Sequence, residues 1–215
     1  MIHISKNPLS GKIFNALRDK IVFMEYPPGM SLSDKELCKM FGVSSTPIKE
    51  AIRKLEEMKL VTVIPRYGTY VTTLDINEIR CAFEVKIKLE GLAGSVAARR
   101  ITADKLEELR SLVERADELI KKGGQRKLIE IDTKFHEILY RSTQNPILQE
   151  ILENIHCRCA RLWNSALTDS VPITKVLEQL KGIYESLKKR DSSAASALLE
   201  NHVLYFIDLI KSQLL

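Results

Sequence analysis

Three residues in the second half of the chain could bind one metal ion. Asp132 and His136 lie four positions apart, so a helix through them would present a carboxylate and an imidazole on one face, about one turn from each other. Both groups are ligands of divalent transition metals. His202, in a later helical segment, is the natural distant third ligand. The alternative is a surface Asp–His pair together with a histidine that is merely hydrogen-bonded.

The same histidine does not belong to a hydrolase motif. His136-Glu137 is followed by Ile-Leu-Tyr, which departs from the His-Glu-x-x-His pattern that places two metal ligands and a general base on one helix. The chain also lacks a Gly-x-Ser-x-Gly elbow, a Gly-rich phosphate loop and a dinucleotide fingerprint. We therefore expect no enzymatic activity, with a metal-dependent hydrolase in a helical bundle as the alternative.

The segments that would position these residues are helical. From Asp75 onward, apolar residues recur every three to four positions in six segments, which predicts helices at roughly 75–99, 102–122, 125–143, 146–168, 172–189 and 191–213. They are separated by residues that cap or break helices: Thr102, Gly123-Gly124, Asn145-Pro146, Pro172 and Asp191-Ser192-Ser193. Because the connections are short, residues 75–215 are predicted to form an all-α antiparallel bundle.

A pair of shorter helices is predicted ahead of the bundle. Ser33 followed by Glu36 is a capping box, so a helix should run from there to about Met40. Gly42 can adopt the left-handed conformation that ends this helix. A second helix should then begin within three or four residues, because Ser44 and the residues after it fit a new helix start.

The second helix has one apolar and one polar face. Ser44 is expected to cap its amides, and Pro47 is tolerated in the first turn because that N–H would be unpaired anyway. Five apolar residues recur at helical spacing and should face the core: Ile48, Ala51, Ile52, Leu55 and Met58. The other face is polar: Ser45, Thr46, Lys49, Arg53 and Lys54. This order predicts a helix-turn-helix that reads DNA with the helix from Thr46 to Met58.

A hairpin completes the first unit. β-Branched runs at Leu60–Ile64 and Thr69–Thr73 bracket Pro65-Arg66-Tyr67-Gly68, so we expect a wing with Arg66 at its tip. Residues 1–74 are therefore predicted to form a winged helix-turn-helix DNA-binding domain, and the chain as a whole to be mainly α. The alternative is a solvated helical interaction domain with surface lysines.

The charge distribution favours DNA as a partner. The chain of 215 residues has a formal net charge of +5; residues 1–74 hold 11 basic and 7 acidic groups, whereas residues 75–215 hold 22 and 21. The surplus thus lies where phosphates would need it. The length suits two domains, and 45% apolar residues is enough for ordinary cores.

Targeting signals and cysteine motifs are absent from the sequence. The N-terminal residues lack the apolar run of a signal peptide, and no stretch approaches about eighteen consecutive apolar residues, so we expect a cytoplasmic protein with no membrane association. The four cysteines match neither a zinc ribbon nor a Cys-x-x-C motif. Cys38 and Cys81 are interpreted as small core residues.

Five segments of the first unit occur in a diagnostic order and spacing: Gly29–Ser33, Glu36-Leu37, Phe41–Leu55, Leu60-Val61 and Gly68–Val71. They resemble the DNA-binding domain of GntR-type bacterial transcription regulators. The resemblance implies contacts to double-stranded DNA from these residues: Ser44, Ser45, Thr46, Lys49, Arg53, Arg66 and Gly68. Ser45 and Lys49 stand where the family usually has Arg, which reads guanine with two parallel hydrogen bonds, so a different or more weakly bound half-site is expected.

The second half contains a further set of matching segments: Phe83–Lys86, Leu89-Glu90, Ala97–Arg99, Asp132-x-x-x-His136, Asn145-Pro146, and Asp191 leading to His202. They resemble the helical effector-binding domain, called FCD, of the FadR branch of GntR regulators. The resemblance implies a divalent metal (Zn, Ni or Mn) held by an Asp and three His, with a small carboxylate completing its coordination. Asp132, His136 and His202 match three of those positions, whereas Leu180 stands in place of the fourth.

Two departures from the family leave the ligand open. With Leu180 at the fourth position, one interpretation is a three-ligand metal site open to water or effector, and the other is a metal-free pocket for an acyl or apolar effector. Lys86 replaces the family's Arg, which weakens the grip on a carboxylate. Arg158 is the candidate counter-charge for an acidic effector, and His156 is expected at the surface or at an interface.

Together these observations predict a ligand-responsive transcription regulator. A homodimer is expected, because one recognition helix contacts too few base pairs to be selective and a pseudo-palindromic operator mirrors a two-fold protein. The bundle should sense a small molecule, with an organic acid as the first candidate. The remaining alternative is an architectural DNA-binding protein with no effector.

Overall fold

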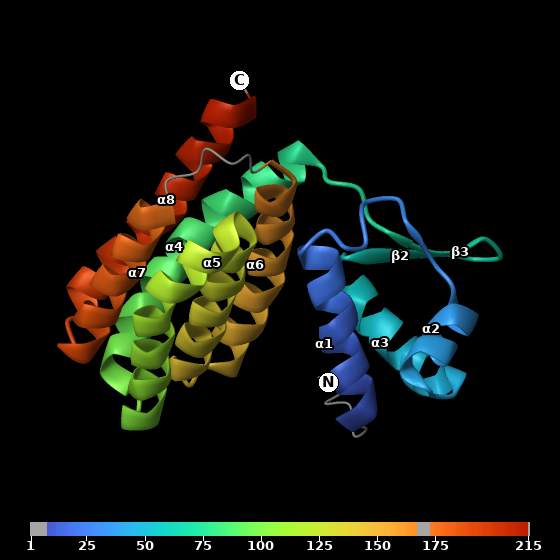
Figure 1. Ribbon diagram of the computed structural model, residues 1–215, viewed down its shortest axis with the longest axis horizontal. Coiled ribbons are helices and arrows are strands. Elements are labelled where there is room, and N and C mark those ends of the chain that lie inside the picture. The colour runs from blue at the N-terminus through green and yellow to red at the C-terminus, as the bar shows by residue number, and fades with distance from the viewer. Residues whose placement is uncertain (1–7, 167–172, 215) are drawn as a thin grey trace. The chain divides into compact units, whose positions relative to one another are not determined.

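Residues 8–166 and 173–214 are described by the computed structural model, which separates the chain into two units, Met1–Asp75 and Ile76–Leu215. The first unit contains three helices and three short strands in this chain order: α1 (Pro8–Val22), β1 (Ser31–Leu32), α2 (Asp34–Phe41), α3 (Ser45–Glu57), β2 (Val61–Ile64) and β3 (Gly68–Val71). The strands form one antiparallel sheet in the order β1-β3-β2. The predicted winged helix-turn-helix is confirmed (Figure 1).

Local chemistry sets the ends of α2 and the start of α3. Ser33 is the N-cap of α2 and accepts a hydrogen bond from the Glu36 amide at 3.4 Å, while Gly42 ends the helix with φ of 66°. Ser44 is the N-cap of α3, but its side chain makes no capping hydrogen bond, contrary to the prediction. The reason is Pro47, which occupies the third helical position, where a capping side chain usually finds an N–H.

The apolar face of α3 packs on a helix that the sequence patterns did not predict. Four of the five expected α3 residues are buried: Ile48, Ala51, Ile52 and Leu55. They pack against α1, whose inward face is Ile13, Leu17 and Ile21. Lys54 was assigned to the polar face, but its ammonium lies 5.9 Å from the centroid of the Phe14 ring of α1. Lys54 therefore lies at the edge of the polar face, beside α1.

The wing is a tight hairpin. β2 and β3 pair in register from Val61 opposite Val71 to Ile64 opposite Gly68, so the strands are shorter than predicted. Arg66 adopts a left-handed conformation with φ of 71°, which is uncommon for a residue other than glycine. The extra strand β1 pairs with the far side of β3. Residues 65–67 of the hairpin tip are exposed.

The second unit consists of five described helices: α4 (Ile76–Arg100), α5 (Ala103–Ser142), α6 (Pro146–Ala166), α7 (Ile173–Lys188) and α8 (Ser192–Leu214). The all-α prediction is confirmed. The predicted break at Gly123-Gly124 is wrong, because α5 continues through both glycines. Glycine in a helix interior costs about 1 kcal/mol, and the two halves of α5 offset this by packing into one core cluster. The predicted break at Pro172 lies outside the described residues.

The bundle core joins all five helices and includes a close approach of α4 to α8. A Cβ built on Gly94 of α4 would lie 2.6 Å from the carbonyl oxygen of Ala195, so only glycine permits this contact between backbones. Leu180 is fully buried in the same apolar cluster. Among the described residues, no helix is long and apolar enough to cross a membrane.

Candidate functional site

The three residues expected to bind metal lie together inside the bundle. Asp132 and His136 project from α5, and His202 projects from α8. Asp132 Oδ1 lies 2.9 Å from His202 Nε2 and 3.7 Å from His136 Nε2. All three side chains are buried, and one potential ligand atom from each falls within 4.8 Å of the others.

An acceptor on the far side of the imidazole orients His202, whose Nδ1 lies 3.0 Å from Gln179 Oε1. His136 Nδ1 lies 3.3 Å from Glu90 Oε1, a contact without hydrogen-bond geometry. Nε2 of each ring faces the Asp132 carboxylate, so the carboxylate oxygen and the two ring nitrogens lie close enough to converge on one cation. An acceptor behind a ring that faces the ion, such as Gln179 behind His202, is typical of metal-bound histidines.

The electrostatics keep Asp132 in the form that binds metal. Burial opposes ionisation of this carboxyl, but the facing His136 and His202 outweigh it and hold the pKa of Asp132 below its usual range. An ionised carboxylate that is nearly inaccessible to water attracts a positive charge more strongly than an exposed one does.

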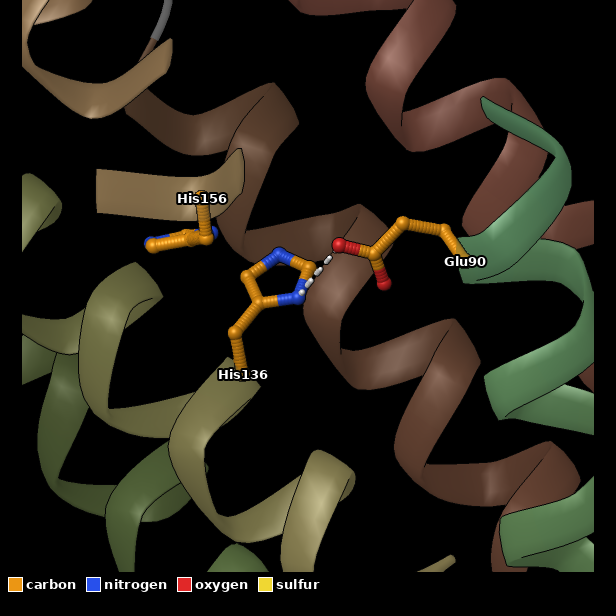
Figure 2. A group of neighbouring side chains, drawn as sticks. All are labelled: Glu90, His136 and His156. Atoms are coloured by element: carbon orange, nitrogen blue, oxygen red, sulfur yellow. Dashed lines mark ion pairs between the residues drawn. The ribbon is translucent and has the colours of Figure 1, made fainter. Parts of the chain in front are cut away.

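A second cluster adjoins the first and shares His136. Figure 2 shows Glu90 of α4 directed toward the His136 ring and His156 of α6 on the other side of that ring. The centroids of the His136 and His156 rings are 4.8 Å apart. Glu90, His136 and His156 also offer ligand atoms within 4.8 Å of one another.

Lys86 makes this second cluster a poor place for a metal. Its ammonium forms a buried ion pair with Glu90 and lies 3.1 Å from Tyr140 Oη and 3.5 Å from His156 Nδ1. The lysine therefore already supplies the positive charge that Glu90 requires. A metal bound there would meet a buried like charge, which is costly in a medium of low dielectric constant.

The pKa shifts in this cluster agree with that interpretation. Burial would raise the pKa of Glu90, but His136 and Lys86 outweigh it and hold the pKa well below its ordinary value. Burial, supported by the charge of Lys86, holds the pKa of His156 well below 6.5, so this imidazole is neutral near pH 7. Burial and the nearby Glu90 raise the pKa of Tyr140. The cluster is thus built around a Lys86–Glu90 ion pair, with a neutral His156 and a protonated Tyr140 hydroxyl beside it.

A cavity of about 40 Å³ opens beside both clusters. That volume is enough for about three water molecules, at roughly 10–15 Å³ each on the same measure. Its lining includes five polar side chains: Lys86, Asp132, His136, His156 and His202. The remaining lining residues are largely apolar: Phe83, Ile129, Cys159, Ala160, Trp163, Val203, Phe206 and Ile210. The cavity can hold a small molecule that makes both polar and apolar contacts.

Two expectations about α6 are not met. Arg158, the candidate counter-charge, forms an ion pair with Glu78 at the start of α4 and does not line the cavity. His156 was expected at the surface or at an interface but is buried in the cavity wall, 7% exposed. The signal for His156 was present in the sequence, because Leu152, His156, Cys159 and Trp163 share one helix face and all are buried. Lys86, the other predicted effector contact, does line the cavity.

The cysteine interpretation also requires correction. Cys81 is exposed and Cys38 is only partly buried, so neither belongs to the core. Cys157 and Cys159 are both buried, and burial raises the pKa of the Cys159 thiol to about 11. A thiol with that pKa is protonated near pH 7 and is a poor nucleophile.

The residues predicted to contact DNA are all exposed on the first unit: Ser44, Ser45, Thr46, Lys49, Arg53, Arg66 and Gly68. Arg53 Nη1 lies 3.6 Å from Glu57 Oε1, one turn further along α3, and both side chains are more than half exposed. An exposed pair of this kind contributes little free energy, so Arg53 remains available to a phosphate or a base.

Comparison with known proteins assigns both units. The description "Bacterial regulatory proteins, gntR family" matches residues 9–71, and "FCD domain" matches residues 81–204, more than half of the chain. The HTH-type transcriptional repressor RspR of Escherichia coli (strain K12) is 26% identical over 91% of this chain and 86% of its own length. The uncharacterized HTH-type transcriptional regulator YdhC of Bacillus subtilis (strain 168) is 29% identical over 90% and 85%.

A solved structure shows the same fold across the whole chain. The structure of E. coli McbR/YncC aligns with a TM-score of 0.85 and 22% sequence identity, covering 97% of this chain and 100% of that chain. At 22% sequence identity, this similarity shows a shared fold and no more.

Proposed function

The chain belongs to the GntR family of bacterial DNA-binding transcription regulators with an FCD effector-binding domain, and from this premise we propose that it is an acid-responsive regulator of the FadR subfamily. The observation that carries the proposal is the buried group of Asp132, His136 and His202 beside a cavity. We further propose that the FCD unit, residues 75–215, forms a homodimer. The DNA-binding unit is assigned to residues 1–74.

DNA recognition is assigned to the exposed face of α3. Ser45, Thr46, Lys49 and Arg53 would enter the major groove, and Arg66 of the wing would contact the backbone or the adjacent minor groove. Two copies would read a pseudo-palindromic operator with half-sites about one helical turn apart. Support comes from the exposure of all these residues and from the cationic surplus of residues 1–74.

A divalent transition metal is the proposed cofactor, held by Asp132, His136 and His202. The residues fit such an ion because the ionised carboxylate faces two imidazole nitrogens, one of them on a ring that Gln179 orients from its far side. When bound, the metal would supply a Lewis-acidic position that accepts a carboxylate oxygen. With three protein ligands, at least one coordination position remains for water or effector.

A metal-free effector pocket is the second candidate. The apolar half of the cavity wall, including Phe83, Val203 and Phe206, would suit a short acyl chain. In that case Asp132 and His202 would form a protonated hydrogen-bonded pair, since their 2.9 Å separation is compatible with one shared hydrogen. The two candidates differ in one measurable quantity, the metal content of the protein.

Effector binding is proposed to act on DNA through α4. Phe83 and Lys86 of α4 line the cavity, and α4 begins at Ile76, five residues after the wing strand ends at Val71. A ligand that shifts α4 would change the spacing of the two recognition helices and release the operator. The relative RspR carries the name repressor, which favours release of DNA as the regulatory response.

The regulator is tested with labelled DNA from the region upstream of its own gene. We expect the anisotropy of this DNA to report much tighter binding than scrambled DNA of equal length, with a salt dependence that reflects several released counterions. Equal, weak binding to both DNAs would contradict the operator proposal. Metal analysis of protein purified without chelators should give close to one equivalent of transition metal; less than about a tenth, with none taken up on addition, would favour the metal-free pocket.

A further inference from the structure

Two glutamates occupy the last turn of α3, the helix assigned to the major groove. Glu56 and Glu57 are both exposed, and α3 ends at Glu57. A carboxylate is disfavoured in the last turn of a helix because the helix dipole is negative there, and it is disfavoured near phosphates because they carry the same charge. The electrostatics of a DNA-binding surface therefore explain neither glutamate.

The two side chains make different contacts. Glu57 Oε1 lies 3.6 Å from Arg53 Nη1, and both side chains are more than half exposed. Glu56 Oε1 instead accepts a hydrogen bond from the backbone amide of Val63 at 3.0 Å. A charged acceptor makes such a hydrogen bond stronger than one between neutral groups. Because Val63 belongs to β2, this contact joins the recognition helix to the wing.

The pairing of the sheet leaves the Val63 amide open to Glu56. The strand order is β1-β3-β2, so β2 is an outer strand. The Val71 amide of β3 donates to Met30 on the β1 side, and successive residues of a strand alternate between its two neighbours. Thr69, two residues before Val71, therefore also faces β1, and Val63, which pairs with Thr69, faces the open edge. The Glu56 carboxylate supplies the acceptor that a further strand would have supplied.

The wing tip is a closed turn that moves as one piece. The Tyr67 amide donates to the Ile64 carbonyl at 3.0 Å, and the Tyr70 hydroxyl donates to the Tyr67 carbonyl at 3.3 Å. Pro65 in the second position and Arg66, with φ of 71°, in the third are the features of a type II turn. The place that Arg66 reaches therefore depends on the angle between the whole hairpin and α3.

The hairpin is fastened at two heights. At its base, the Thr72 hydroxyl donates to the Lys59 carbonyl at 2.8 Å. The Glu56 contact lies about 10 Å further along β2, and the tip another 10 Å or so beyond it, at about 3.3 Å per residue. With the base alone, a tilt of about 10° would displace the tip by roughly 3–4 Å, which is more than a hydrogen bond tolerates. The contact of Glu56 with Val63 removes that tilt.

We propose that Glu56 is a positioning residue for DNA binding: by accepting the Val63 amide it sets the angle of the wing to α3, so that Arg66 reaches DNA while Lys49 lies in the major groove. This inference rests on the proposed function, because it assigns a role within the same DNA interface. Glu56 does not itself contact DNA. Its negative charge weakens binding slightly, and the placement of Arg66 outweighs that effect.

Opposite effects of two neighbouring substitutions test the proposal. The full-length protein is titrated into labelled DNA from the region upstream of its own gene. Glu57→Leu removes one carboxylate and should bind this DNA as tightly as wild type or up to about threefold more tightly. Glu56→Leu removes the same charge together with the acceptor, and should bind about fivefold more weakly. Leucine and glutamate have similar helix propensities, so α3 is preserved in both variants.

Glu56→Gln separates the acceptor from the charge. Its amide oxygen can still accept the Val63 amide, so we expect affinity equal to or above that of wild type. A loss of affinity in Glu56→Gln would overturn the proposal, because it would mean that the carboxylate itself reads a base. Equal effects of Glu56→Leu and Glu57→Leu would also overturn it. Glu56→Ala and Glu57→Ala repeat the comparison if either leucine variant fails to fold.

A double-mutant cycle links the effect to the wing. Arg66→Ala should weaken binding of wild type but cause a much smaller further loss in Glu56→Leu, because the wing is already misplaced there. Lys49→Ala should cause the same loss in both backgrounds, whereas general damage to the domain would alter both cycles. Equal losses from Arg66→Ala in the two backgrounds would overturn the proposal.

The hydrogen bond can be measured without DNA. In the ¹⁵N-labelled, full-length protein the Val63 amide should exchange with solvent faster in Glu56→Leu than in wild type, and Glu56→Gln should remain protected. An equal exchange rate in wild type and Glu56→Leu would show that the hydrogen bond is not formed and would overturn the proposal.

Operator selectivity of wild type separates this inference from the proposed function. If wild type prefers the upstream DNA over scrambled DNA but Glu56→Leu behaves like Glu57→Leu, the role of Glu56 is wrong and the regulator stands. If wild type binds both DNAs equally and weakly, the proposed function fails and this inference fails with it.

Discussion

Replacing Gln179 by Leu should weaken metal binding although Gln179 is not itself a metal ligand. Its Oε1 lies 3.0 Å from His202 Nδ1, where in the proposed metal-bound form it would accept the proton of that nitrogen and leave the Nε2 lone pair for the metal. In Gln179→Leu the buried imidazole, 1% exposed, has no acceptor at Nδ1. The proton then favours Nε2, where it can donate to Asp132 at 2.9 Å, and a metal must displace it.

The size of this effect follows from one hydrogen bond and the orientation it provides. A neutral hydrogen bond contributes about 1 kcal/mol, and loss of a partner outside the coordination shell typically costs 10–100-fold in metal affinity. We therefore expect the dissociation constant for Zn²⁺ to rise by about tenfold to a hundredfold, or about 1.4–2.7 kcal/mol. Competition with a chromophoric chelator measures this constant directly.

Two further variants make the Gln179 experiment decisive. Gln179→Glu keeps an acceptor beside Nδ1 and should bind Zn²⁺ at least as tightly as wild type. Gln149→Leu is the matched control, because the side chain of this half-buried glutamine of α6 hydrogen-bonds Glu153 and does not line the cavity. Unchanged affinity in Gln179→Leu, or an equal loss in Gln149→Leu, would refute the proposed role of the Gln179 acceptor.

Three other predictions address DNA recognition, pH dependence and packing. Lys49→Ala and Arg53→Ala should each weaken operator binding about tenfold and reduce the slope of log affinity against log salt by about one where a phosphate contact is lost; unchanged anisotropy curves would reassign the recognition face. Because the folded-state pKa of His156 lies well below its unfolded value of 6.5, folding excludes a proton there, so the free energy of unfolding should fall as pH drops below about 6.5. Urea titrations at pH 7.5 and 5.5 should show a smaller loss in His156→Phe, and an identical loss would contradict the assignment. Gly94→Ala should destabilise the bundle by about 1–3 kcal/mol because its Cβ meets a backbone carbonyl of α8, whereas Gly182→Ala, whose Cβ has 3.9 Å of space, should be neutral or slightly stabilising in thermal unfolding.

The fold was predictable because its signals are local. The capping box at Ser33, the left-handed Gly42 and the helical spacing of the α3 apolar residues each act within a few positions, and all three occur as predicted. The break predicted at the paired glycines 123 and 124 was wrong because the free-energy cost of glycine in a helix is small compared with the stabilisation from packing of α5, the 40-residue helix that contains them. The capping hydrogen bond predicted for the Ser44 side chain does not form, because Pro47 lacks the backbone N–H that would have been its donor.

The site was only partly predictable because its members come from different helices. The spacing of Asp132 and His136 identifies two groups on one helix, but nothing local in the sequence places Glu90 or Gln179 behind their rings. These partners come from α4 and α7, and their positions depend on how the helices pack. His156 was missed for another reason: it lies close in sequence to Arg158, the candidate counter-charge that was expected to face inward, so His156 was expected at the surface or at an interface.

The position of α4 explains how a small cavity could influence a separate unit. One face of α4 carries Lys86 and Glu90, the ion pair beside His136, while Gly94 allows α4 to pack directly on α8, which carries His202. The site therefore has α4 on one side and α8 on the other, held together by a contact that tolerates no added methyl group. In the mechanism proposed above, a ligand that displaces α4 would act on residues 72–75, the chain segment between the wing strand β3 and α4.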